Sequence, residues 1–200
     1  HLNKELSNDE IRKLDCDILV FAVGTKAVLP VKFEGFTNVI TQDEAILKSK
    51  TMGKNVVIWG LDTYWKGGAE TAITLREQGY NIKAIAGPEK GLAGLITGPA
   101  LTGRVTWIHR YFKENKIPVF KEAKLLDVTD KTVIIQDSEG KEHEIEAETL
   151  VHIGGRTTPK KSLEKEFADV GFKVEFVGDC KSPKDIQAAI RDGQTLARAI

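Results

Sequence analysis

Short apolar runs alternate with polar, glycine-containing segments along the chain, and their lengths predict strands and helices in turn. The run 55–59 (Asn-Val-Val-Ile-Trp) ends at Gly60, a polar turn follows, and residues 69–78 carry apolar positions at helical spacing. Gly79 tolerates the positive φ that ends a helix, and a second apolar run occupies 82–86. This order of buried strand, turn, helix and buried strand predicts the opening βαβ unit of a nucleotide-binding sheet.

The other runs predict the rest of an α/β fold. Further strands are expected at 17–23, 117–120, 149–153 and 174–177, with a residual strand at 2–6. Helices are expected at 8–14, 42–48, 104–115, 161–168 and 185–200, the first with Ser7 as N-cap and Glu10 completing a capping box. Segments 124–128, 132–137 and 143–147 alternate at strand period between turns. The chain therefore predicts a Rossmann-like parallel sheet with helices on both faces, together with a small antiparallel meander.

Composition narrows the class of protein. The 200 residues are 41% hydrophobic, which suffices for a packed core, and 29 basic residues balance 29 acidic ones. This balance argues against nucleic acid or a membrane surface as a partner, and the longest apolar runs are only strand-sized. Without an initiator Met or a signal peptide, the chain is expected to be a piece of a longer protein. Two scattered cysteines, Cys16 and Cys180, suit the cytoplasm and predict neither a disulfide nor a metal site.

The turn after the first strand departs from the usual dinucleotide fingerprint. Free N–H groups at a helix start bind phosphate, and glycines let the backbone approach it. Here Gly60 is followed by six non-glycine residues, including bulky Tyr64 and Trp65, before Gly67-Gly68. The second strand ends in Ala86-Gly87-Pro88, without the acidic residue that NAD readers use for ribose and without an Arg for a 2′-phosphate. The nucleotide-binding fold is well indicated, whereas ADP or AMP is expected to bind more tightly than NADH.

The order of motifs resembles one family of flavoproteins. The strand 18–23 with Gly24, Thr25 and Pro30 is similar to the element that links the flavin and nucleotide domains of two-dinucleotide-domain flavoproteins. The stretch 177–184 (Val-Gly-Asp-Cys-Lys-Ser-Pro-Lys) and the helix after it resemble the C-terminal portion of the 2,4-dienoyl-CoA reductase and trimethylamine dehydrogenase family. Its members join an old-yellow-enzyme barrel to this module. Asp62-Thr63-Tyr64-Trp65 is more similar to the amine dehydrogenases, which hold ADP rather than a working NAD(P)H.

The resemblance implies a domain plan and a set of partners. Residues 50–155 would be a nucleotide-binding Rossmann-like domain, flanked by two pieces of a flavin-type domain at 1–49 and 156–200. ADP or NAD(P) would bind the inserted domain, while FAD or FMN and a 4Fe-4S cluster would belong to the parent oxidoreductase. The partners would be an N-terminal barrel and the other half of the flavin domain in the same polypeptide, in the cytoplasm. The piece itself would be non-catalytic.

The expected cofactor-binding residues follow the same resemblance. On the nucleotide side they are Gly60, Asp62, Thr63, Tyr64, Gly67, Gly68, Gly87, Gly154 and Arg156. On the flavin side they are Gly24, Thr25, Gly178 and Asp179, with Asp179 accepting a hydrogen bond from a ribityl or ribose hydroxyl. No catalytic residue or metal ligand is expected, and the histidines are assigned to surface or core positions.

Several structural interpretations compete with these roles. Asp179 would instead cap the segment after it, Asp62 and Thr63 would cap the following helix, and Tyr64 with Trp65 would seal the turn against a neighbouring domain. Gly68 is the expected phosphate cradle, so a valine there should abolish nucleotide binding at little cost in stability. Two further functions stay open: an NAD(P)H-dependent reductase module that passes hydride to FAD, and a structural domain that binds nothing.

Overall fold

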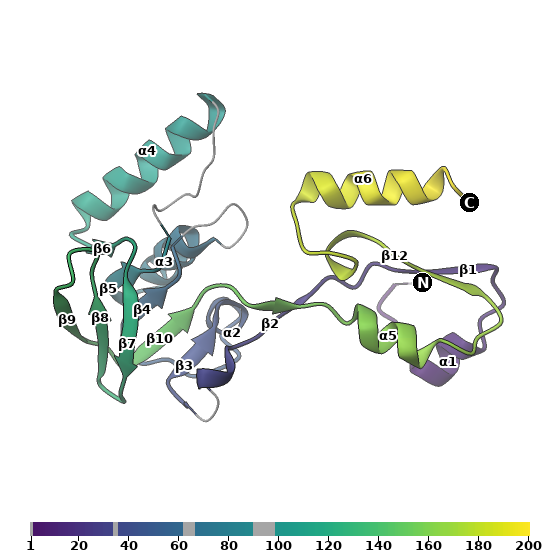
Figure 1. Ribbon diagram of the computed structural model, residues 1–200, viewed down its shortest axis with the longest axis horizontal. Coiled ribbons are helices and arrows are strands. Elements are labelled where there is room, and N and C mark those ends of the chain that lie inside the picture. Colours follow the sequence, from purple (N-terminus) through teal and green to yellow (C-terminus); the bar gives the residue numbers. More distant parts are fainter. Residues whose placement is uncertain (1, 34–35, 62–66, 90–98) are drawn as a thin grey trace. The chain divides into compact units, whose positions relative to one another are not determined.

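The computed structural model describes residues 2–33, 36–61, 67–89 and 99–200 of the chain (Figure 1). Two compact units emerge. The outer unit combines His1–Lys26 with Arg156–Ile200, and the inserted unit is Ala27–Gly155. The sequence analysis starts the nucleotide-binding domain at residue 50, whereas the compact unit starts at residue 27. The reason is that β3 (Val39–Thr41) pairs with a strand of the inserted unit's sheet.

The inserted unit is built on a five-stranded sheet with the strand order β3-β10-β4-β5-β6. The other four strands are β4 (Asn55–Trp59), β5 (Asn81–Ala86), β6 (Val119–Phe120) and β10 (Thr149–His152). All neighbouring pairs are parallel. Val56, Val57 and Ile58 in the middle of β4 are fully buried, as expected for a parallel strand that is covered on both faces.

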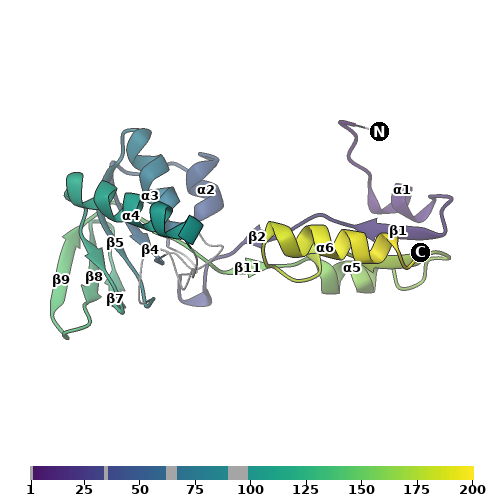
Figure 2. The same ribbon diagram turned by 90° about the horizontal axis from the view of Figure 1, so that it is seen from above.

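Helices cover one face of this sheet. They are α2 (Gln42–Ile46), α3 (Gly68–Glu77) and α4 (Pro99–Glu114), and Figure 2 shows them together along one side of the strands. Ala72 and Leu75 of α3 and Ile108 and Phe112 of α4 pack with Ile58 of the sheet in one apolar cluster. Both α3 and α4 therefore bury their apolar faces against the sheet, as expected for amphipathic helices.

An antiparallel meander covers the opposite face. It consists of β7 (Lys124–Val128), β8 (Thr132–Gln136) and β9 (Glu142–Glu146) in that order. Val133 and Ile135 of β8 pack with Val57 of β4 and Ala84 of β5 in a second cluster. Periodicity predicts the three strands but not the face on which they pack.

The outer unit holds a smaller parallel sheet, in which β1 (Ile18–Phe21) pairs with β12 (Lys173–Phe176). Its other elements are α1 (Asn8–Arg12), α5 (Lys160–Glu166), the 3-10 turn η2 (Gly178–Cys180) and α6 (Ile186–Ala197). Phe21, Phe167 and Phe176 form its core, with ring centroids 5.4 and 5.6 Å from the Phe21 ring. The two segments that join the units, β2 (Lys26–Ala27) and β11 (Arg156–Thr157), pair with each other.

The predicted fold class is confirmed: a parallel α/β sheet with a small meander and a second α/β unit. The capping box of α1 is present, with both Ser7 and Glu10 bonded as expected. Two details differ. Residues 2–6 form no strand, and Val39–Thr41, which the sequence analysis treats only as the approach to a helix, is β3 at the edge of the main sheet. A short 3-10 turn, η1 (Val31–Phe33), precedes it.

Candidate functional site

The carboxyl ends of the parallel strands define the candidate site of the inserted unit. Register places Trp59 of β4 beside Ala86 of β5 on one side and His152 of β10 on the other. From β4 the chain crosses to β5 through α3, while β10 lies on the other side of β4. The strand order therefore reverses at β4. Open α/β sheets bind ligands in the crevice outside the strand ends at such a switch point.

Gly60 and Gly68 let α3 pack closely onto the end of β4. A Cβ atom on Gly68 would overlap the carbonyl oxygen of Gly60, and one on Gly60 would lie 2.7 Å from the Ile153 Cβ. Gly60 also adopts a φ of 120°. Gly68 thus serves backbone packing, which corrects the expectation that a valine there costs little stability. Its place at the start of α3 is as predicted.

Gly67 caps α3 in an unusual way. It is the N-cap with a left-handed φ of 65°, and among the described residues no side chain bonds to the cap's free N–H groups. Its carbonyl accepts from the Thr71 hydroxyl at 2.7 Å, and Gln42 Nε2 donates to Thr71 Oγ1 at 2.8 Å. Gln42 begins α2, so one helix fixes the first turn of the next. Sequence patterns do not predict the contact between Gln42 and Thr71, because these residues are 29 positions apart and meet only in the folded chain.

Glu70 lies in the same first turn of α3. Its Oε1 accepts from the Arg104 guanidinium of α4, and its buried Oε2 has no hydrogen-bond partner in the described part of the chain. A carboxylate here interacts favourably with the positive end of the helix. It would therefore compete with a phosphate for that end.

Glu89 is an acidic residue that lies beside the end of β4, although β5 itself ends in Ala86. It lies three residues beyond the end of β5, yet its Oε2 accepts the backbone N–H of Leu61 at 3.0 Å, directly after Gly60. Gly87 makes this possible, because a Cβ atom there would overlap that carboxylate and lie 2.6 Å from the Leu61 nitrogen. Gly87 therefore lies at the crevice, as predicted, and its lack of a side chain leaves the space that the Glu89 carboxylate occupies.

Asp62, Thr63 and Tyr64, predicted as nucleotide contacts, lie outside the described residues, as does Trp65. Their capping, stacking and sealing roles all stay predictions. The described ends of the turn are Leu61, which is fully buried, and Gly67.

Gly154 lies just past β10 at the same edge of the sheet, with a φ of 110°. Gly155 follows with a φ of 63°, and its carbonyl accepts the Val28 N–H at 2.8 Å. A side chain at Gly155 would overlap the Val28 carbonyl oxygen, which lies 2.6 Å from the Cβ position. These glycines therefore allow the chain to leave the sheet beside the segment by which it entered.

Arg156, Gly24 and Thr25 belong to the outer unit. Arg156 Nε donates to the Thr25 hydroxyl at 2.7 Å, and a terminal nitrogen donates to the Thr25 carbonyl at 3.3 Å. Gly24 adopts a φ of 68° just before this contact. The described bonds of Arg156 thus hold the two joining segments together.

Gly178 and Asp179 follow β12 in the outer unit. Gly178 has a φ of 61°, and Asp179 Oδ1 accepts the Lys184 N–H at 3.1 Å. This bond supports the capping interpretation of Asp179. The second carboxylate oxygen still suits a hydroxyl donor of a flavin ribityl chain, so the residues fit an edge contact with that group but supply no phosphate-binding turn of their own.

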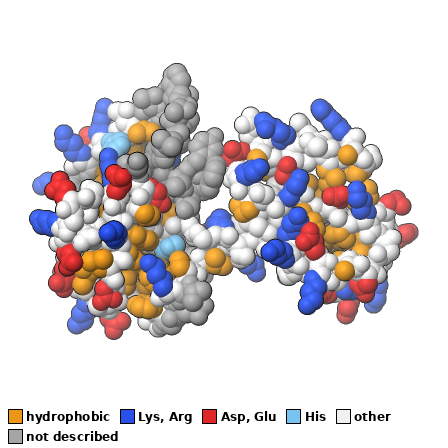
Figure 3. All heavy atoms as spheres, viewed as in Figure 1, with side chains coloured by type: hydrophobic (Ala, Val, Ile, Leu, Met, Phe, Trp, Pro, Cys, Tyr) orange, Lys and Arg blue, Asp and Glu red, His pale blue; other side chains and the backbone are white. Residues whose placement is uncertain are grey.

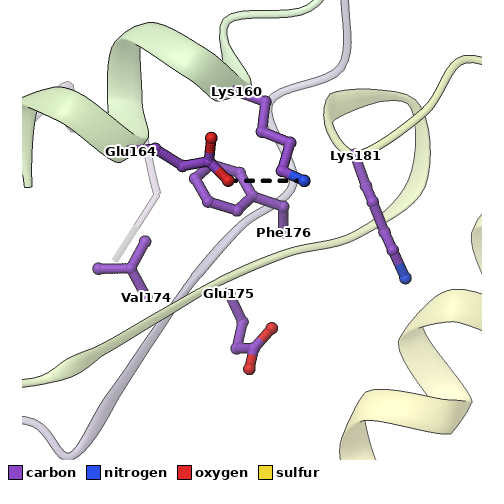
Figure 4. Close-up of a pocket in the computed structure, with 6 residues that line it drawn as sticks. All are labelled: Lys160, Glu164, Val174, Glu175, Phe176 and Lys181. Carbon is purple, nitrogen blue, oxygen red and sulfur yellow. Dashed lines mark ion pairs between the residues drawn. The ribbon is translucent and has the colours of Figure 1, made fainter. Parts of the chain in front are cut away.

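A shallow pocket of about 240 Å³ lies beside β12 (Figure 4). It is lined by Lys160, Glu164, Val174, Glu175, Phe176 and Lys181. Lys160 Nζ lies 3.5 Å from Glu164 and 5.8 Å from the Phe176 ring centre, and Lys173 pairs with Glu175 at 2.7 Å. Charges of both signs balance around the pocket, which gives it no preference for an anion.

Titratable clusters elsewhere are structural. His143 Nε2 lies 2.7 Å from Asp137 Oδ2, and this hydrogen bond lowers the pKa of Asp137, which also accepts the N–H groups of Glu139 and Lys141. The group organises the β8–β9 turn. Within the described residues, no set of three His, Cys, Asp or Glu side chains is arranged to hold a metal ion.

The surface is consistent with the balanced composition. On the face shown in Figure 3, basic and acidic side chains are interspersed over both units. No helix in the described ranges is long and apolar enough to cross a membrane. Cys16 is exposed and Cys180 is buried, and both are free thiols.

The fold is shared with solved structures of a reductase, a dehydrogenase and an amine oxidase. The chain is similar over 100% of its length to 2-naphthoyl-CoA reductase in complex with 2-naphthoyl-CoA, with a TM-score of 0.83 and 22% identity. It is similar over 99% to histamine dehydrogenase from Rhizobium sp. 4-9 (TM-score 0.78, 16% identity). Over 98% it is similar to 6-hydroxypseudooxynicotine amine oxidase from Pseudomonas geniculata N1 (TM-score 0.80, 18% identity).

These similarities show the fold and not the activity. The chain spans 29%, 33% and 30% of the three matched proteins, respectively. No family model matches the chain, and no curated protein matches it by sequence.

Proposed function

We propose that the chain is a nucleotide-binding module of a flavin-dependent oxidoreductase, with ADP or NAD(P) bound by the inserted unit. The observation that carries the proposal is the switch point at β4. There the start of α3 and the glycine backbones of Gly60 and Gly87 meet beyond the carboxyl ends of the strands. A helix start with free N–H groups next to bare backbone suits a phosphate.

The parent activity rests on the structural neighbours. A reductase, a dehydrogenase and an amine oxidase share the fold across nearly all of this chain. A parent of this kind would place FAD or FMN and a 4Fe-4S cluster outside the chain, in the cytoplasm. The flavin would supply the redox chemistry. The chain would bind and orient the nucleotide without catalysing a reaction itself.

The outer unit supports a partner from the rest of a flavin domain. Within the described residues its sheet has only β1 and β12, and a two-stranded sheet is only marginally stable alone. The apolar side chains of this unit that are exposed to solvent include Val20 of β1 (40%), Val23 just after β1 (64%), and Ile186 (81%) and Ile190 (58%) of α6. Strands of the flavin-domain half, preceded by a barrel, would cover this apolar surface.

Glu89 favours a second candidate function. A carboxylate near the ribose position suits NADH as well as ADP, so a reductase module that passes hydride to FAD stays a direct competitor. The third candidate is a structural domain with no ligand. The three differ in which nucleotides they bind.

The test is a calorimetric titration of the chain with ADP, NADH and NADPH, combined with amide NMR shifts. ADP should bind, and its shifts should centre on Gly60, Gly68 and Gly87. NADH binding tenfold more tightly than ADP, about 1.4 kcal/mol, would favour the reductase module. Absence of binding by all three nucleotides would favour the structural domain and overturn the proposal.

A further inference from the structure

The segment after β5 is held in a bend by the segment after β6. The Gly87 N–H donates to the Phe120 carbonyl at 3.1 Å, and the Ala123 N–H donates to the Gly87 carbonyl at 2.9 Å. The Glu122 N–H donates to the Glu89 carbonyl at 2.9 Å. Backbone bonds on both sides of Pro88 therefore fix the position of Glu89, which explains how a residue beyond the strand can reach back to its edge.

The carboxylate of Glu89 lies at the start of the β4–α3 turn. Its Oε2 accepts the Leu61 N–H at 3.0 Å, and Leu61 is fully buried. The neighbouring Gly60 N–H donates to the Ala86 carbonyl at 2.7 Å. The carboxylate thus lies where β4 and β5 end side by side, and the missing Cβ of Gly87 provides its space.

This position has a definite chemical preference. An ionised carboxylate only accepts hydrogen bonds, and its two oxygens offer about four lone-pair sites, of which one is used by a described residue, through the Leu61 N–H. The vicinal hydroxyls of a ribose are two donors of matching kind. A 2′-phosphate carries about two negative charges at neutral pH and offers only acceptors. The Glu89 carboxylate should therefore bind the ribose hydroxyls and repel a 2′-phosphate.

We infer that Glu89 binds the ribose hydroxyls of the nucleotide and excludes a 2′-phosphate, so that the inserted unit takes ADP or NAD(H) rather than NADP(H). The inference rests on the proposed nucleotide site. Glu89 is thus the residue that selects ADP or NAD(H) over NADP(H). Glu89 acts through its charge and its remaining acceptor sites, whereas its hydrogen bond to Leu61 is structural.

The experiment compares NAD⁺ with NADP⁺, and ADP with 2′-deoxy-ADP, by calorimetry. Glu89→Gln retains an amide oxygen for the Leu61 N–H, removes the charge and replaces the other acceptor oxygen by an NH₂ donor. Glu114→Gln, at the exposed end of α4, is the matched control. The wild type should bind NAD⁺ at least tenfold more tightly than NADP⁺ and ADP about fivefold more tightly than 2′-deoxy-ADP. The NAD⁺ preference should fall below about threefold in Glu89→Gln and persist in Glu114→Gln.

Each outcome decides a different point. Equal binding of NAD⁺ and NADP⁺ by the wild type, or an unchanged preference in Glu89→Gln, would overturn the role of Glu89 and leave the nucleotide site standing. Failure of the wild type to bind any of the four ligands would overturn the proposed function and this inference together. The comparison of ADP with 2′-deoxy-ADP needs no variant, so a poorly folded Glu89→Gln protein would not remove the test.

Discussion

Gly68 packs with its α-carbon against the carbonyl oxygen of Gly60, so that the first residue of α3 and the residue that closes β4 meet backbone to backbone. Gly68 is itself buried. This contact sets the distance between the helix and the sheet at the candidate site. It also makes Gly68 a packing residue whose replacement affects the whole inserted unit.

Gly68→Ala should therefore destabilise the inserted unit by about 1–3 kcal/mol, because the added methyl group overlaps backbone that cannot move aside. Gly103→Ala is the control, since Gly103 is exposed in α4 with open space around its Cβ position. That substitution should stabilise the protein by about 0.5–1 kcal/mol through helix propensity. Denaturant unfolding of both variants measures the contrast, and equal effects would contradict the packing role.

Thr71→Val should destabilise the protein by about 1–3 kcal/mol, although valine has nearly the same shape. Thr71 is 1% exposed, and its hydroxyl connects the Gln42 amide to the Gly67 carbonyl. Valine leaves the Gln42 amide donor without its acceptor in a partly buried place. Thr71→Ser retains the hydroxyl and should cost clearly less. Thermal melts of the two variants should separate, and coincident melts would mean that the bond contributes nothing.

The stability of the outer unit should depend on pH through Arg12 and Asp169. Arg12 Nη1 donates to Asp169 Oδ1 at 2.7 Å, and this bond lowers the pKa of Asp169 below its ordinary value of 3.8. A lowered folded-state pKa gives stability that is present above the unfolded value and disappears as pH falls through the folded one. Asp169→Asn should therefore melt earlier than the wild type at pH 7, and the difference should shrink as the pH falls below 3.8 and vanish once the folded carboxylate is protonated.

The control for this pH series is Asp15→Asn, which changes an exposed aspartate of the same unit. Its melting temperature should follow the wild type across the whole range. A difference between the Asp169→Asn variant and the wild type that persisted in acid would show that the bond acts through something other than the charge of the carboxylate.

The chain by itself should not retain a flavin. The outer unit offers Gly178 and Asp179 at the end of β12, and one oxygen of Asp179 already accepts the Lys184 N–H. These are edge contacts, and a flavin needs a phosphate-binding turn as well. Purified chain should show no stoichiometric absorbance near about 450 nm, where oxidised flavin absorbs, since the chromophore belongs to the cofactor. Bound flavin at one equivalent would contradict this.

The sequence pattern was sufficient to predict those elements whose buried residues are continuous or regularly spaced along the chain. The β4–α3–β5 unit could be predicted because 55–59 and 82–86 are continuous apolar runs and Gly79 ends the helix between them. Strand β3 could not, because only three residues form it and their burial depends on pairing with β10. Its partner lies far along the chain, and nothing near Val39 indicates it.

The candidate site was predictable in its place but not in its chemistry. The glycines at 60, 67, 68, 87 and 154 all lie at strand ends or the helix start, as expected. Glu89 was missed because an acidic residue is expected at the strand's last position, whereas here backbone bonds to 120–123 bring a later residue back. The packing role of Gly68 was not predicted, because the sequence gives no sign that the Gly60 carbonyl lies against it.

Pairing of β1 with β12 sets an order for the folding of the two units. Arg12 and Glu166, which interact in the outer unit, are 154 residues apart in the chain, and closing so long a flexible loop is entropically costly. The inserted unit contains most of the intervening chain, and once folded it holds its two ends together through the Val28–Gly155 bond. Loop closure for the outer unit then involves only the few joining residues. The inserted unit should thus fold first, and the Phe21–Phe176 core of the outer unit should form afterwards. Substitutions that slow folding of the inserted unit should therefore also delay folding of the outer unit.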